Sequence, residues 1–154
     1  MNLILTGLFI WGAWVVMPFP CFAAPVVVST PAELEPLTLS EALADYHASG
    51  ELETFQCVHV PVGKNNQTGA IPLAVEFDDR IYLRIDGKLL AVDRSSTFDR
   101  HSSYSSKTTQ VDVFVLKTTN TKEFGESSNR LMLLKATNAG RAFSVETFGA
   151  ACGI

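Results

Sequence analysis

The segment 80–92, RIYLRIDGKLLAV, restricts the fold of this chain more than any other stretch. Apolar side chains alternate through RIYLRI, which is the period of a strand with one buried face, so Tyr82 is expected on the opposite face. Asp86 and Gly87 then predict a two-residue hairpin turn, because glycine accepts the positive φ that a type I′ turn requires. The segment therefore predicts two antiparallel strands.

Further runs with strand character follow the same pattern and are separated by short, turn-rich connections. Counted with the hairpin, they give about seven strands, which predicts a mostly β domain: a small antiparallel barrel or sandwich. The other runs are ETFQCVHV at 53–60, AIPLAVEF at 70–77, VDVFVLKT at 111–118, RLMLLKA at 130–136 and RAFSVETF at 141–148.

One or two short helices are expected before the strands. Thr30 and Glu33 have the spacing of a capping box with a proline between them, and Thr38 and Glu41 repeat that spacing. Gly50 can end the second helix. The domain division is therefore a signal peptide at 1–23, an N-terminal helical segment at 24–50 and an antiparallel β domain at 51–154.

The residues 3–17, LILTGLFIWGAWVVM, form an apolar run without charge, and small residues follow it. This order is typical of a secretory signal peptide, and about 15 residues is short of the roughly 20 needed to span a bilayer. Cleavage after Ala23 places Cys21 at position −3, whereas cleavage after Ala24 would place Phe22 there. The sequence predicts a periplasmic or secreted protein without stable membrane insertion after cleavage; a membrane anchor is the alternative.

Cleavage would leave Cys57 and Cys152 as the remaining cysteines. Two cysteines in an exported domain most simply form a disulfide. The chain-entropy model gives a loop of roughly 95 residues a stabilisation of about 4–5 kcal/mol. A reactive or metal-binding pair is the alternative, but no Cys-x-x-Cys motif or histidine cluster accompanies it, so no metal or cofactor is expected. Lipidation of Cys21 is disfavoured by Pro20, which stands where a lipoprotein signal has a small residue.

Charge is distributed unevenly along a chain whose net charge is −4. Residues 24–79 contain nine acidic side chains and only one basic side chain, Lys64. Nucleic acid is not expected as a partner, because phosphates require clustered lysine and arginine. An acidic surface would suit a basic protein partner, although an ordinary solvated surface has the same composition.

The stretch 94–107 is long and polar, and it lies between two segments with strand character. It is expected to form a loop, and a loop of this length on a rigid β scaffold favours a binding role. Arginine and tyrosine are enriched at binding hot spots, and serine supplies adaptable hydrogen bonds. A solvated loop without function is the alternative.

No catalytic or cofactor-binding pattern is apparent in the chain. Asp99, His101 and a neighbouring serine have the residue types of a nucleophilic triad, but a single flexible stretch lacks the rigid support that catalysis needs. The sequence therefore predicts a binding protein and no enzyme.

The order LETFQC, IPLAVEFDDRIYLRIDGKLLAVDRSS, SSY, VDVFVLK and a late cysteine resembles the periplasmic and membrane-bound inhibitors of c-type lysozyme (the MliC/PliC family). The resemblance covers roughly residues 52–117 and Cys152. Tyr104 matches the loop tyrosine of that family and Lys117 matches its strand lysine, whereas Arg100 and His101 stand where the family has serine and glycine. The resemblance implies a small exported β-barrel that inserts a loop serine and a lysine into a lysozyme cleft.

The expected function is therefore an exported inhibitor of a cell-wall-degrading enzyme. The target would be a basic cell-wall hydrolase, either a lysozyme or a toxin effector; the latter would make the chain an immunity protein. A non-catalytic envelope accessory or ligand-binding protein is the alternative. The residues expected to bind the partner are Arg100, His101, Ser102, Ser103, Tyr104, Lys107 and Lys117.

Overall fold

A computed structural model describes residues 33–51, 56–63, 70–119 and 128–152. The expected signal peptide, its cleavage at Ala23 or Ala24, and the start of the first expected helix at Thr30 lie outside these ranges. Within them, none of the helical structure is long and apolar enough to cross a bilayer. The N-terminal segment contains one described helix, α1 (Leu39–Ala48), and residues 33–38 before it are not helical.

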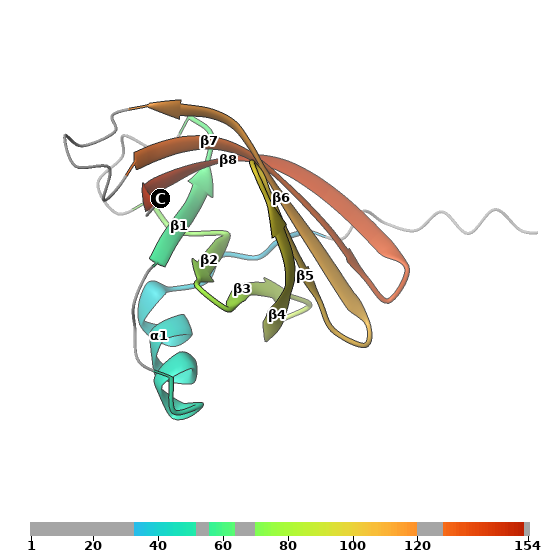
Figure 1. Cartoon of the computed structure of the whole chain (residues 1–154). Helices are drawn as coiled ribbons and strands as arrows, with labels where there is room; N and C mark the ends of the chain where they lie inside the picture. Colours follow the sequence, from blue (N-terminus) through green and yellow to red (C-terminus); the bar gives the residue numbers. More distant parts are fainter. Residues whose placement is uncertain (1–32, 52–55, 64–69, 120–127, 153–154) are drawn as a thin grey trace, which may run out of the picture.

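The strands form a closed antiparallel barrel in which each strand pairs with its neighbour in the chain (Figure 1). The last strand returns to the first, with Val58 opposite Ala150 and Pro61 opposite Thr147. This architecture confirms the predicted small β-barrel with a helix. The strands are β1 (Gln56–Pro61), β2 (Ala74–Phe77), β3 (Arg80–Ile85), β4 (Lys88–Phe98), β5 (His101–Ser105), β6 (Thr109–Thr119), β7 (Ser128–Asn138) and β8 (Arg141–Cys152).

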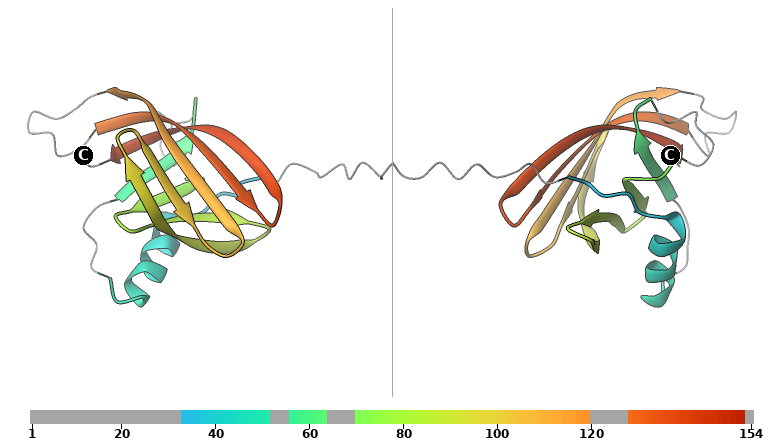
Figure 2. Two further views of the ribbon diagram at one scale, coloured as in Figure 1. Left: turned by 45° about the vertical axis from the view of Figure 1, so that its right-hand side comes forward. Right: turned by 180° about the vertical axis from the view of Figure 1, so that it is seen from behind.

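The polar stretch 94–107 is not a loop, and this prediction was wrong. β4 continues to Phe98, the chain turns at Asp99 and Arg100, and β5 pairs with β4 on one side and β6 on the other (Figure 2). Pairing with β5 holds the end of β4, and pairing with both β4 and β6 holds β5, although no apolar alternation marks either part. The stretch is therefore part of the barrel wall, with one short turn at its centre.

Helix α1 begins with the expected capping box. The Glu41 amide donates to the Thr38 hydroxyl over 3.1 Å, and the Thr38 amide donates to the Glu41 carboxylate over 2.9 Å. The helix then covers the outer face of β2 and β3. Tyr46 stacks on Phe77 with ring centroids 4.3 Å apart, and Tyr82 points out of the barrel but is fully buried beneath the helix.

Aliphatic side chains from most strands fill the barrel interior, and a disulfide joins strand β1 to strand β8. Cys57 on β1 bonds Cys152 on β8, which confirms the predicted pair; their Cα atoms are 4.4 Å apart. Gly149 makes room for this bridge, because a Cβ there would lie 2.6 Å from the Cys152 sulfur and 2.9 Å from the Cys57 sulfur. The disulfide thus reinforces the seam at which the barrel closes.

Candidate functional site

The residues predicted to bind a partner do not form one surface. Side chains alternate along β5, so His101 and Ser103 lie on the outer face of the barrel, whereas Ser102 and Tyr104 lie on the inner face. Arg100 and Lys107 flank this strand at opposite ends, at least about 13 Å apart at the usual rise of a strand. Lys117 is exposed on β6, which continues past the Arg100 end.

Tyr104 cannot contact a partner, because its exposed fraction is 0%. Its hydroxyl donates to Glu76 Oε1 over 2.5 Å and accepts from Arg94 Nη2 over 3.1 Å. Burial and the nearby Glu76 carboxylate raise the pKa of Tyr104. Its assignment as a binding residue was wrong: the family-like tyrosine is a core residue of this barrel.

A buried polar cluster surrounds Glu76 inside the barrel. Besides Tyr104, the carboxylate contacts His59, whose Nε2 lies 3.2 Å from Oε2, and Arg94, whose Nη2 lies 3.3 Å from Oε1. The other ring nitrogen of His59 lies 3.2 Å from the Thr147 hydroxyl. Burial alone would raise the pKa of Glu76, but hydrogen bonds from His59 and Tyr104 and the charge of Arg94 hold it below its ordinary value.

A second polar cluster lies on the outer face of β5 and β6. Asp112 Oδ1 accepts from the Ser103 hydroxyl over 2.6 Å and lies 3.0 Å from His101 Nε2, while Asp112 Oδ2 accepts from Gln110 over 3.1 Å. Burial would raise the pKa of Asp112, and the hydrogen bonds from Ser103, His101 and Gln110 outweigh it and lower that pKa. The His101 ring also stacks on Phe114 at 4.2 Å.

These outer residues are not arranged as a catalytic triad. In a triad the histidine uses one ring nitrogen for the serine and the other for the carboxylate. Here Nε2 of His101 lies near both groups, 3.1 Å from the Ser103 hydroxyl and 3.0 Å from Asp112. Because the Ser103 hydroxyl donates directly to the Asp112 carboxylate, the histidine does not stand between the serine and the acid as a triad requires. The expected partner of this histidine, Asp99, lies in the β4–β5 turn instead.

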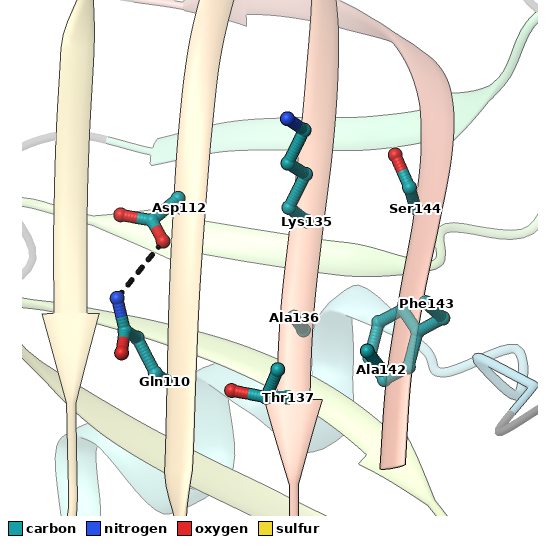
Figure 3. A pocket seen from close by; sticks show the side chains of 8 residues that line it. All are labelled: Gln110, Asp112, Lys135, Ala136, Thr137, Ala142, Phe143 and Ser144. Atoms are coloured by element: carbon teal, nitrogen blue, oxygen red, sulfur yellow. Dashed lines mark hydrogen bonds between the residues drawn. The ribbon is translucent and has the colours of Figure 1, made fainter. Parts of the chain in front are cut away.

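A shallow pocket of about 480 Å³ adjoins this outer cluster on β6, β7 and β8. Figure 3 shows Gln110 and Asp112 on β6 beside Lys135 on β7; Phe143 on β8 also lines the pocket, and it packs against the interior core. Lys135 also lies over the Phe114 ring, with its Nζ 5.3 Å from the centroid. Both charge signs therefore meet at this pocket, in Asp112 and Lys135. Its lining residues are Gln110, Asp112, Lys135, Ala136, Thr137, Ala142, Phe143 and Ser144.

The β4–β5 turn carries the most exposed of the large apolar side chains among the described residues. Phe98 precedes the turn and is 83% exposed, and Arg100 within the turn is exposed beside it. Beyond the turn, β6 continues with Leu116, which is 44% exposed, and with Lys117. We call Phe98, Arg100, Leu116 and Lys117 the tip surface. Among the described residues no carboxylate forms an ion pair with either cation of this surface.

Sequence reasoning missed several residues of the two clusters and of the tip surface. Asp112 was visible as an acid within an otherwise apolar strand, and Phe98 as an aromatic residue in a polar stretch. Glu76 and His59 gave no local signal, because the pairing of β1 with β2 brings them together inside the barrel. Comparison with known proteins finds no matching family model, no matching curated protein and no matching solved structure.

Proposed function

We propose that the protein is an exported, non-catalytic inhibitor of a cell-wall-degrading hydrolase, and that the tip surface contacts the target. The observation that carries this proposal is the exposure of Phe98 at a tight turn between two strands of the barrel wall. A large apolar side chain in that position costs solvation energy unless a partner covers it. In this proposal the tip surface has the binding role that the sequence analysis gave to a long loop.

The chemistry of the tip surface suits a hydrolase cleft. Glycoside hydrolases use two carboxylic side chains to cleave the glycosidic bond, so their clefts are acidic at the reacting centre. Arg100 and Lys117 can complement those carboxylates, and Phe98 can occupy an adjoining sugar-binding position. The Asp99 backbone adopts φ of 51°, and pairing of Phe98 with His101 closes the turn behind it. A preorganised turn loses little entropy on binding.

Inhibition of cell-wall lysis tests this proposal. Purified protein is mixed with a c-type lysozyme, and the clearing of a cell-wall suspension is followed by turbidity. We expect inhibition that falls at least tenfold in Phe98→Ala and in Arg100→Ala. The matched control is Lys107→Ala, an exposed cation at the other end of β5 that should inhibit as well as the unchanged protein.

Two outcomes would contradict the proposal. If Lys107→Ala weakened inhibition as much as Arg100→Ala, the contact would not be confined to the tip surface. If the protein inhibited neither lysozyme nor any other cell-wall hydrolase tested, the inhibitor function would be wrong. The immunity version is tested in the same assay with a toxin hydrolase in place of lysozyme.

A second candidate function is the binding of a small ligand, which the pocket on β6, β7 and β8 favours. A ligand with a carboxylate could pair with Lys135, and Gln110 could hydrogen-bond to it from the neighbouring strand. This function predicts that Lys135→Ala abolishes ligand binding and that Phe98→Ala does not. The same pair of variants therefore separates the two candidates.

A further inference from the structure

Four side chains that can bind a transition metal meet inside the barrel at the disulfide. Cys57 and His59 lie two residues apart on β1 and therefore share its inner face, and Glu76 on β2 lies directly opposite Cys57. The Cys57 sulfur, a ring nitrogen of His59 and a carboxylate oxygen of Glu76 all lie within 4.8 Å of one another. Cys152 adds a second sulfur, because it is bonded to Cys57.

The surrounding hydrogen bonds leave Glu76 Oε2 and His59 Nε2 as the atoms that face the cysteine sulfurs. Tyr104 and Arg94 bind Oε1 of Glu76, so Oε2 remains the oxygen next to His59. The contact of His59 Nδ1 with the Thr147 hydroxyl leaves Nε2 toward the same oxygen. A metal-binding histidine usually has such a partner on its second nitrogen, which fixes the ring orientation.

The distance between the nitrogen ligand and the oxygen ligand also fits a zinc site. His59 Nε2 and Glu76 Oε2 are 3.2 Å apart. Zinc bonds of about 2.0–2.1 Å at tetrahedral angles place neighbouring oxygen and nitrogen ligands about 3.3 Å apart. The disulfide between the two sulfurs must first be reduced, because only the free thiolates can bind a metal.

We propose that reduction of the Cys57–Cys152 disulfide turns this cluster into a zinc site with two sulfur ligands, one nitrogen and one oxygen. A dithiol reductant supplies the two electrons by thiol–disulfide exchange: its own sulfurs become a disulfide, and each cysteine sulfur takes up a proton. Zn²⁺ then displaces both protons and binds the two thiolates, His59 Nε2 and Glu76 Oε2.

Charge supports this assignment. Zinc with two thiolates and one carboxylate has a net charge of −1, and the Arg94 guanidinium, already paired with Glu76, balances it. Thiolate and imidazole ligands select zinc over magnesium or calcium, which prefer oxygen. The bound metal would keep β1 joined to β8 when the disulfide is open.

Cobalt and zinc binding to the purified protein tests the site. The protein is reduced under anaerobic conditions and titrated with Co²⁺, whose thiolate charge-transfer and visible bands report tetrahedral coordination. We expect one equivalent to bind the reduced protein, zinc to displace it, and the oxidised protein to give no bands. Zinc should also raise the unfolding midpoint of the reduced protein and leave that of the oxidised protein unchanged.

Variants separate this site from binding by thiols alone. Thr147→Val, which removes only the partner of the His59 ring, should weaken zinc affinity by about 10- to 100-fold. His59→Gln should weaken it further, whereas His101→Gln, an outer-face histidine that also contacts a carboxylate, should leave it unchanged.

Three results would overturn the proposal: equal binding by reduced and oxidised protein, equal affinity of Thr147→Val and the unchanged protein, or binding that persists in denaturant. Because the first comparison uses the unchanged protein, it decides the question even if His59→Gln fails to fold.

Discussion

Glu76 is the residue on which the polar interior of the barrel depends. A carboxylate taken out of water is costly unless hydrogen bonds and an opposite charge replace the lost hydration. Tyr104, His59 and Arg94 supply them from three other strands, β5, β1 and β4. The side chain that sequence reasoning assigned to a binding loop thus helps to keep a buried charge in place.

Tyr104→Phe is expected to lower the free energy of unfolding at pH 7 by about 1–3 kcal/mol, because it leaves Glu76 with one hydrogen bond fewer. The pH dependence should change as well. The pKa of Glu76 in the folded protein lies below its ordinary value of 4.5, so its stabilising contribution is present above about pH 4.5 and is lost as the pH falls through the folded pKa. The variant should lose less stability on acidification.

Urea unfolding at pH 7 and at pH 3 measures both effects. Ser105→Ala, at the next and exposed position of β5, serves as the control and should behave as the unchanged protein. If Tyr104→Phe and the unchanged protein lost equal stability between the two pH values, the assigned role of this hydrogen bond would be incorrect.

At the scale of elements, helix α1 makes the barrel asymmetric. It covers the outer face of β2 and β3 and leaves the outer face of β5 to β8 without a cover among the described residues (Figure 1). The capping box fixes where this helix begins, and Glu41 also accepts from Arg84 on β3 over 2.7 Å. This ion pair therefore joins the first turn of the helix to the barrel.

Thr38→Ala should destabilise the protein by about 1 kcal/mol, because it removes the acceptor of the Glu41 amide at the helix N-terminus. Ser40→Ala, an exposed position in the first turn, is the matched control and should change stability by less than about 0.5 kcal/mol. Thermal unfolding of the two variants checks this. A loss for Thr38→Ala no larger than that for Ser40→Ala would refute the contribution of the cap.

The sequence predicted those elements whose signals are local. The capping box at Thr38 and the turn at Asp86 and Gly87 both occur where expected, with Asp86 at φ of 51° and Gly87 at 73°. The strand β5 was missed because its serines show no apolar period and because its turn has Asp99 at positive φ where no glycine marks it. Its conformation is imposed by pairing with β4 and β6, and the sequence of the stretch alone does not contain that information.

For the same reason, the candidate site was only partly predictable. The polar stretch does carry the exposed Arg100 and the partly buried His101, but the barrel separates them from Lys107 and turns Tyr104 inward. Whether two residues share a surface depends on strand register, which is a property of the closed barrel. The disulfide, in contrast, was predictable by counting the cysteines that the expected signal cleavage would leave.

At the scale of the whole molecule, the barrel closes at a short seam. β1 and β8 are registered over four residue pairs, from Val58 opposite Ala150 to Pro61 opposite Thr147, whereas β7 and β8 are registered over a much longer stretch. The strands that meet at this seam are the first and the last among the described residues, so the loop that must be closed contains nearly the whole barrel. The disulfide lies at the end of this seam and joins residues 95 positions apart.

The double variant Cys57→Ala/Cys152→Ala is expected to lose about 2–5 kcal/mol of unfolding free energy, because the unfolded chain regains the freedom of that large loop. Urea unfolding in the presence of a chelator measures the loss without any contribution from metal. Amide exchange should speed up more along β1 than along β7, since fewer residue pairs hold β1. Unchanged unfolding free energy would mean that side-chain packing alone closes the barrel. Faster exchange in β7 than in β1 would show that the barrel opens elsewhere.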